Sequence, residues 1–364
     1  MRYKHLKPKH FVSLIMLLIA NCAVFAQELS DTKYITRSFS VNRETNIEVS
    51  NKYGMVSIET WNSDSVKFVI SATARASTSV DVASSLNNID FQFINTDHYV
   101  IAKTLFLNPS RAIINDLKSI FSKSNGMNID YKIYVPKTVN LKIENKFGDI
   151  YANTLAGSIS LILSYGKLKV YQVDGQLNLN LNYVDNAEIE KMTRGNCDIS
   201  FSNILIKQTA TLDLNSNFSK IDINEIDDIQ AESTNDEINI IELKNGDINS
   251  KFSKINIGYL SNSFIGDSKF GTITFKKLAS DFSKINIGTK YSDVNVYFDA
   301  NLIGFNLEIS NQKSRIMYPR IYNLKEELIN QKESIYRTSG HIGKASNSRI
   351  YVDANHGNIN IKTK

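Results

Sequence analysis

Apolar and polar residues alternate along most of this chain, and a short polar turn that holds one aromatic residue interrupts the alternation at regular intervals. The turn is followed by an apolar pair, as in Asn-Lys-Phe-Gly-Asp-Ile at 145–150 and Asn-Phe-Ser-Lys-Ile at 217–221. The aromatic positions 147, 165, 183, 201 and 218 are 18, 18, 18 and 17 residues apart, and the next step, to 252, is 34, twice 17. Alternation with period two predicts strands, and the constant interval predicts a repeat architecture.

One repeat has room for two short strands and two corners. In the repeat around residue 218, residues 211–215 alternate, 216–219 form a turn, and 220–223 alternate again. A single repeat cannot bury its apolar face, but copies stacked at about 4.8 Å align leucine on leucine and ring on ring. We therefore predict an all-β fold, a parallel β-solenoid with rungs of 17–22 residues, and the crossover preference predicts right-handed winding. An antiparallel meander is the alternative, although it gives no reason for an aromatic at every second corner.

The aromatic corner position predicts a column of rings that lines a dry interior. Glycine follows the ring in four copies and serine in others, which suits a corner that needs positive φ or a local hydrogen bond. Asn235 takes the ring position in one repeat, which should be a weak point, and Lys313 takes it in a later one. The predicted structural corner stack consists of Tyr53, Phe147, Tyr165, Tyr183, Phe201, Phe218, Phe252, Phe270, Tyr291 and His356.

Three segments are expected after the leader described below. Residues 27–138 are predicted to form a β-rich N-terminal capping module, with an irregular start, strands near 66–72, 89–94, 98–105 and 127–135, and helical pieces at 80–86 and 111–121. Residues 139–313 carry the solenoid repeats. Residues 314–364 hold a charged insertion and the C-terminal rungs, with 322–340 as a loop or a short helix. Exposed solenoid ends invite polymerisation, so both flanking segments are candidate caps.

Residues 1–26 are predicted to be a secretory signal peptide. Four basic residues at positions 2–9 precede an apolar run from Phe11 to Phe25, and cleavage is expected before Gln27. The run is shorter than the about 20 residues that a membrane-spanning helix needs, and no comparable run follows. We therefore expect export to the periplasm or the cell surface, and no transmembrane helix in the mature chain.

Charge and cysteine content narrow the class of protein further. The chain has 42 Lys and Arg against 37 Asp and Glu, and without the four basic residues of the leader the balance is 38 against 37. No global field then recruits nucleic acid or anionic lipid. Cys22 lies in the leader, and its lipidation is an alternative that the preceding Asn21 disfavours. Cys197 is then a single thiol without a disulfide partner, and we expect it to be a small core residue.

Candidate chemistry is sparse along the chain. Hydrolysis of a glycosidic bond needs two carboxyl groups about 5 to 10 Å apart, and the candidate pairs are Asp213 with Asp222 and Asp281 with Asp293. Lysines interleave these carboxylates, as on a solvated ladder face. Beyond the leader, the histidines lack the spacing of metal ligands, and the chain has neither a phosphate-binding glycine loop nor a nucleophile elbow. We predict no catalytic, metal-binding or cofactor-binding residues and no cofactor.

Trp61, the only tryptophan, lies beside the first repeat. An exposed tryptophan can stack on a sugar ring or anchor a protein partner. The alternative is that Trp61 closes the apolar interior as a lid. We name it as a possible partner contact.

At these residues the chain resembles the secreted bacterial β-strand-repeat proteins of the putative adhesin family, the head-GIN type and its relatives of unknown function. The matching features are the leader, residues 50–61, the corners with Tyr or Phe before Gly or Ser, the closing residues 340–343 and residues 355–357. The resemblance spans nearly the whole mature chain and implies a β-strand-repeat fold with an adhesin-like role. It implies no catalytic residue.

The sequence therefore favours a secreted, non-enzymatic interaction scaffold of the bacterial envelope that presents a repetitive polar face to an unknown protein or glycan, and not to nucleic acid. Two alternatives from other classes remain. One is a polysaccharide-degrading β-helix enzyme, which a groove with clustered carboxylates would favour. The other is a periplasmic sensing module in envelope-stress signalling, which a neighbouring sigma-factor gene would favour.

Overall fold

The computed structural model describes residues 28–107 and 126–363, and in this part of the chain every regular element except one helix is a β-strand. The prediction of an all-β fold is confirmed. The predicted signal peptide, Cys22 and the helical piece at 111–121 lie outside the described residues. The chain divides into two compact units. Of the described residues, one unit contains 28–33, 72–89, 106–107 and 126–128, and the other contains 34–71, 90–105 and 129–363.

The first unit holds the start of β1 (Leu29–Ser40), the end of β4 (Ser65–Ala76) and the helix α2 (Ser79–Asn87). The Thr78 side chain accepts a hydrogen bond from the Asp81 backbone N–H and caps α2, which confirms the helical piece predicted at 80–86. The expected irregular start is wrong, because β1 is a strand that pairs with β4. Its side chains are mostly exposed on both faces, so burial imposes no apolar alternation on its sequence.

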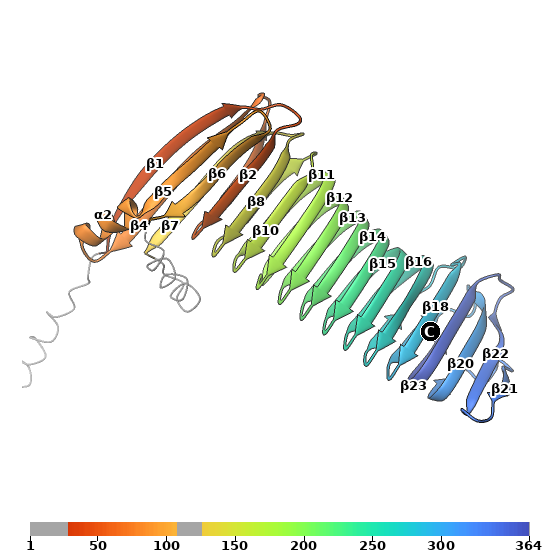
Figure 1. Cartoon of the computed structure of the whole chain (residues 1–364). Coiled ribbons are helices and arrows are strands. Elements are labelled where there is room, and N and C mark those ends of the chain that lie inside the picture. Colours follow the sequence, from red (N-terminus) through yellow and green to blue (C-terminus); the bar gives the residue numbers. More distant parts are fainter. Residues whose placement is uncertain (1–27, 108–125, 364) are drawn as a thin grey trace, which may run out of the picture. The chain divides into compact units, whose positions relative to one another are not determined.

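The second unit contains the repeats, and Figure 1 shows β8, β10 and then β11 to β16 side by side in chain order. Besides the larger parts of β1 and β4, this unit contains wholly or mostly the strands β2 (Asn46–Lys52), β3 (Val56–Trp61), β5 (Ile89–Asn95), β6 (Tyr99–Phe106), β7 (Met127–Pro136), β8 (Asn140–Lys146), β9 (Ile150–Leu155), β10 (Ile159–Ser164), β11 (Lys167–Asn182), β12 (Asn186–Ser200), β13 (Asn203–Asn217), β14 (Lys220–Thr234), β15 (Glu237–Lys251), β16 (Lys254–Lys269), β17 (Thr272–Phe275), β18 (Lys284–Lys290), β19 (Asp293–Phe298), β20 (Gly304–Met317), β21 (Lys325–Asn330), β22 (Ile335–Gly343) and β23 (Arg349–Thr363).

Successive repeats pair in parallel and in register. Leu161 lies opposite Leu179, Leu179 opposite Cys197, and Cys197 opposite Leu214, so the partner lies 17 or 18 residues further along the chain. A second parallel ladder starts with β3, β9 and β11 and runs beside the first. From β11 to β16 one long strand contributes to both ladders, and β17, β18 and β19 are again separate short strands. These pairings exclude the antiparallel meander for this part of the chain.

The interior is built from aliphatic columns that follow the register. One column contains Leu161, Leu179, Cys197, Leu214 and Ala231, each at most 2% exposed. The side chain of Cys197 is fully buried and free, so it is the small core residue that the sequence predicts. Burial raises the pKa of its thiol to about 12, helped by the nearby carboxylates of Asp198 and Asp213.

The last repeats do not follow chain order. The strand β23 lies between the repeat formed by β18 and β19 and the strand β20, which precedes β23 in the chain (Figure 1). It pairs in parallel with β18, β19 and β20. β20 then pairs on its other side with β22, in the antiparallel sense, and β22 pairs with β21. The expected loop or short helix at 322–340 is therefore wrong, because most of this segment is an antiparallel β-hairpin. The charged residues that suggested a helix lie in β21, as Lys325, Glu326 and Glu327, and in the turn that follows it, as Lys332 and Glu333.

Candidate interaction surface

The aromatic residues at the corner position stack face to face in two runs. The first run is Tyr53, Phe147, Tyr165, Tyr183, Phe201 and Phe218, with centroid distances of 5.8, 5.0, 5.1, 4.9 and 5.1 Å. The second run is Phe252, Phe270, Tyr291 and His356, with distances of 5.0, 5.3 and 4.6 Å. The step in each run matches the spacing of neighbouring strands.

The stack lies on the outside of the repeats. Most of its rings are about half exposed, from 36% for Tyr165 to 55% for Phe218, although Tyr53 at the start is buried. The expectation that the rings line the dry interior is wrong, since aliphatic columns fill that space. Alternation identifies inward positions only within a strand, and these rings stand on the turn between two strands.

The ring residues share an uncommon backbone conformation. Their φ angles lie between 48° and 63°, a region that costs an L-residue about 1–2 kcal/mol. The backbone N–H of each Tyr and Phe in the stack donates to the carbonyl that precedes the ring position in the next repeat, as from Phe201 to Asn217 at 3.1 Å and from Phe218 to Thr234 at 3.1 Å. A repeated hydrogen bond and the ring contacts therefore hold a conformation that most residues avoid.

The residue after the ring is chosen by space and by hydrogen bonding. We expected glycine there to supply positive φ, and this is wrong, because Gly148 and Gly166 have no positive φ. A Cβ on Gly148 would instead lie 1.9 Å from the carbonyl oxygen of Gly54. Where serine takes this position, its hydroxyl accepts the N–H of the preceding repeat, as Ser219 does from Ser202 at 3.1 Å and Ser253 from Asp236 at 3.1 Å.

The stack is interrupted at Asn235. This residue has the same conformation, with φ of 57°, and the same hydrogen bond to the next repeat, at 2.9 Å from Lys251. Its side chain is exposed and makes no hydrogen bond to the residues that the structure describes. The two rings that flank it, Phe218 at 55% and Phe252 at 50%, are the most exposed of the series.

A buried carboxylate holds the backbone at the interrupted corner. Asp236 is 5% exposed and accepts hydrogen bonds from the hydroxyls of Ser216 and Ser233 at 2.7 and 2.8 Å and from the backbone N–H of Ser219 and Thr234 at 2.7 and 3.0 Å. The repeat that has lost its ring therefore has additional polar contacts in place of ring stacking.

A polar groove runs across β12 to β16, with a volume of about 630 Å³. Two rows of outward side chains border it, one containing Thr211, Asp228 and Asn245 and the other containing Asp213, Gln230 and Asp247. Arg194 is the one basic side chain in its lining. The groove therefore offers closely spaced hydrogen-bonding groups with an excess of negative charge.

Amide side chains link the outward rows from one repeat to the next. Along one row Asn256 donates to Asn239 and Asn239 to Asp222, each at 2.8 Å. Beside the groove Asn245 donates to Asp228 at 2.8 Å. These side-chain ladders fix the orientation of the polar face without a ligand.

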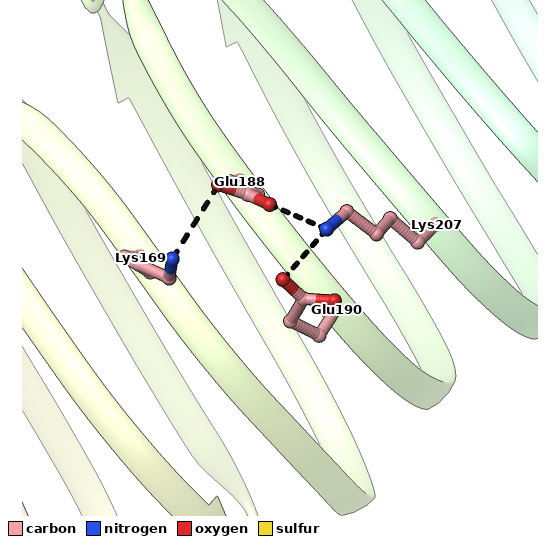
Figure 2. Close-up of polar contacts among 4 residues, drawn as sticks. All are labelled: Lys169, Glu188, Glu190 and Lys207. Atoms are coloured by element: carbon pink, nitrogen blue, oxygen red, sulfur yellow. Dashed lines mark hydrogen bonds and ion pairs between the residues drawn. The ribbon is translucent and has the colours of Figure 1, made fainter.

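A charged cluster lies on the opposite ladder of β11 to β13. Figure 2 shows the Lys207 ammonium between Glu188 at 2.8 Å and Glu190 at 2.7 Å, with Lys169 3.7 Å from Glu188. The hydrogen bond from Lys207 lowers the pKa of Glu188, and the same contact raises the pKa of Lys207. The members are partly exposed, so the cluster is a solvated ion-pair network.

The candidate carboxylate pairs occupy ordinary ladder positions. Asp213 borders the groove, whereas Asp222 lies on the other ladder, where it accepts from Asn239. Asp293 accepts from the backbone and side-chain nitrogens of Asn358, at 2.8 and 2.9 Å. Asp281 lies in the turn before β18. The structure gives neither pair a shared cavity.

The described histidines are scattered. His341 contacts the Asn306 side chain and the Lys344 carbonyl, and His356 stacks on Tyr291. Within residues 28–107 and 126–363, no three His, Cys, Asp or Glu side chains lie close enough to hold a metal ion.

Trp61 is half-buried at the end of β3. Its indole N–H donates to the Ser65 carbonyl at 2.8 Å, and its ring lies 5.5 Å from that of Tyr134. The Lys132 ammonium lies 5.2 Å from the Tyr134 ring and pairs with Glu59 at 3.0 Å. Trp61 thus keeps one part of its ring accessible in an aromatic and charged neighbourhood.

Of the helices in the described residues, none is both long and apolar enough to cross a membrane.

No protein-family model and no curated protein matches this chain. Among solved structures it is similar to a putative cell adhesion protein from Clostridium sporogenes, at 15% identity and a TM-score of 0.18, over 92% of this chain and 100% of the other. It is also similar to a putative adhesin from Parabacteroides merdae, at 14% identity and a TM-score of 0.35, over 72% and 96% of the two chains. A putative adhesin from Bacteroides fragilis follows, at 11% identity and a TM-score of 0.24, over 91% and 97%. The proposals below rest on this chain's own residues.

Proposed function

We propose that this chain is an exported, non-enzymatic interaction scaffold of the bacterial envelope, adhesin-like in its role, which presents a polar groove to a glycan or protein partner. The observation that carries the proposal is the groove across β12 to β16, where hydrogen-bonding side chains recur at the strand spacing of about 4.8 Å. Groups repeated at this interval suit an extended chain molecule better than a compact small ligand.

The architecture that we propose for this task is a right-handed β-solenoid with rungs of 17–22 residues. Residues 27–138 cap it at one end, and residues 314–364 form the second cap. The parallel register of 17 or 18 residues supports the winding, and the antiparallel hairpin of β21 and β22 supports the second cap. An antiparallel edge with charged side chains is a poor template for another parallel repeat.

The corner stack is proposed to be a structural element, and Trp61 a possible partner contact. Support for the first comes from ring contacts of about 5 Å at successive corners. Support for the second comes from the incomplete burial of Trp61 beside Tyr134. The predicted leader supplies the route of export.

The groove is tested by filling it. We compare binding of the fluorescently labelled wild-type chain to purified cell envelopes with that of a double variant, Thr211→Arg with Gln230→Arg. The matched control is Gln208→Arg, which adds the same side chain on the other ladder, opposite Glu225. We expect saturable wild-type binding, at least tenfold weaker binding of the double variant and unchanged binding of the control.

Pre-treatment of the envelopes with protease or with periodate separates a protein partner from a glycan. Equal binding of the wild type and the double variant would contradict the groove as the contact surface. Turnover of any member of a polysaccharide panel by the purified chain would contradict the non-enzymatic role.

A further inference from the structure

The interruption of the ring stack leaves one face of Phe218 and one face of Phe252 without a stacked ring. Phe218 stacks on Phe201 at 5.1 Å and Phe252 stacks on Phe270 at 5.0 Å, so each of these two rings has one stacked neighbour. The corner between them carries the carboxamide of Asn235 in place of a ring. Phe218 and Phe252 are 55% and 50% exposed, against 48% for Tyr183, which is stacked on both sides.

The space between the two rings is set by the strand register. Asn217 pairs with Thr234 and Thr234 with Lys251, so Phe218 and Phe252 stand two strand spacings apart, about 10 Å. One ring inserted halfway would lie about 5 Å from each phenyl group, which is the step that the stack keeps elsewhere. The slot therefore has the dimension of one six-membered ring.

We propose that this slot is a saccharide-binding site, in which one pyranose ring is held between Phe218 and Phe252 and forms hydrogen bonds with Asn235. A pyranose presents C–H groups on its two faces and hydroxyl groups around its edge. The phenyl faces would cover the C–H groups of the sugar. The Asn235 carboxamide, with one acceptor and two donors, would form hydrogen bonds with its hydroxyl groups. Thr234 and the Lys251 ammonium, 5.4 Å from the Phe252 ring, lie beside the slot.

The polar groups favour a sugar over an aromatic side chain of a protein. A phenyl or indole group in the slot would cover the Asn235 carboxamide and give it no hydrogen bond, which is unfavourable for a buried amide. A pyranose satisfies that amide with a hydroxyl group. The chemistry of the slot, two apolar walls and a polar floor, is complementary to a sugar ring in both respects.

This site deepens the proposed interaction role and rests on it for the class of partner, but its residues are separate from the groove. The groove is bordered by residues such as Thr211 and Gln230, and the slot by the corner residues Phe218, Asn235 and Phe252. The two sites can therefore be abolished independently.

The test fills the slot with a ring from the chain itself. Asn235→Phe should complete the stack, because Asn235 already has the φ and the hydrogen bond of a ring residue. The matched control is Lys313→Phe, since Lys313 has φ of 58° at the corresponding corner of β20, beyond His356. Both variants add one phenyl group at a positive-φ corner, and only the first closes the slot. Phe218→Ala, which removes one wall, is the second loss variant.

The probes are maltotriose, cellotriose, mannotriose and chitotriose, titrated by calorimetry and by proton NMR. We expect at least one to bind the wild type and Lys313→Phe equally, and to bind Asn235→Phe and Phe218→Ala at least tenfold more weakly. The ring protons of the bound sugar should shift upfield in the wild type, because they lie between two phenyl faces.

Several results would overturn the proposal. They are the absence of binding by all four probes, equal binding by the wild type and a folded Asn235→Phe chain, and binding of a tryptophan-containing peptide in the slot where the sugars fail. Saccharide binding that the groove double variant loses and Asn235→Phe keeps would overturn the slot and leave the proposed function of the groove intact.

Discussion

Replacing Phe201 separates the contribution of ring stacking from the cost of the corner conformation. Its ring lies 4.9 Å from that of Tyr183 and 5.1 Å from that of Phe218, and its φ is 49°. Phe201→Ala removes both ring contacts but keeps a Cβ in the left-handed region. Phe201→Gly removes the same contacts and also the strain of that Cβ.

The magnitudes follow from these two terms. Each aromatic pair contributes about 0.5–1.5 kcal/mol, so Phe201→Ala should lower the free energy of unfolding by about 1–3 kcal/mol. A left-handed L-residue costs about 1–2 kcal/mol, whereas glycine loses about 0.5–1 kcal/mol more backbone entropy than alanine on folding. Phe201→Gly should therefore be more stable than Phe201→Ala, by up to about 1.5 kcal/mol. Phe201→Asn should also be more stable than Phe201→Ala, because Asn tolerates the left-handed backbone region.

The matched control is Tyr171, a 57% exposed residue within β11 that has no positive φ. At Tyr171 the alanine variant should be more stable than the glycine variant. Tyr171→Ala should lie within about 0.5 kcal/mol of the wild type in free energy of unfolding, and Tyr171→Gly should lie below Tyr171→Ala. The assay is equilibrium urea unfolding followed by far-UV circular dichroism, with the difference in midpoint multiplied by the m-value. If the alanine variant is more stable than the glycine variant at both positions, the strain argument is refuted. If Phe201→Ala lowers the free energy of unfolding by no more than Tyr171→Ala does, the stacking argument is refuted.

Three further predictions concern other parts of the repeats. Gly148→Ala should destabilise the chain strongly because its Cβ meets a backbone oxygen, whereas the Cβ of Gly195→Ala meets the ends of the Met192 and Leu212 side chains and should cost less, as urea midpoints would show. Cys197 should stay unreactive toward a thiol reagent in the native chain, because its thiol is buried with a pKa of about 12, and labelling faster than unfolding would contradict this. Because Lys207 lowers the pKa of Glu188, the Glu188 carboxylate stabilises the fold above its ordinary pKa and this stabilisation is lost as pH falls through the lowered pKa, so the difference in unfolding midpoint between Glu188→Gln and the wild type should shrink as the pH falls through that lowered pKa.

Sequence reasoning predicts the parts of this fold that repeat. The interval of 17 or 18 residues sets the register, since Leu179, Cys197 and Leu214 fall opposite one another. The strands near 66–72, 89–94, 98–105 and 127–135 are confirmed by β4 to β7. In each case burial on one face imposes an alternation that the sequence displays.

The sequence does not predict the strands whose side chains are exposed on both faces, because burial imposes no apolar alternation on them. The strand β1 exposes both faces, and the β21 and β22 hairpin carries charges that also suit a helix. The position of β23 depends on which edge is open after β18 and β19 have formed, and its own residues would fit several neighbours.

The candidate sites show the same division. Asn235 was visible in the sequence as a missing ring. The slot can be recognised only once the rings are known to lie outside, and the groove only once two outward rows of side chains are known to border it. His356 at the end of the stack, by contrast, is predicted from its place before a glycine at the repeated corner. Its ring lies 4.6 Å from that of Tyr291.

The position of β23 has a consequence for biosynthesis. A ribosome releases residues 304–317 before residues 349–363, yet the later segment lies between the earlier one and the body of the protein. During translation, β20 therefore has to wait without its permanent parallel neighbour, or make provisional contacts and then move aside. A nascent chain halted near residue 345 would present the edges of β18 and β19 to any strand nearby, so late synthesis is the interval in which this protein is most exposed to joining another copy of itself.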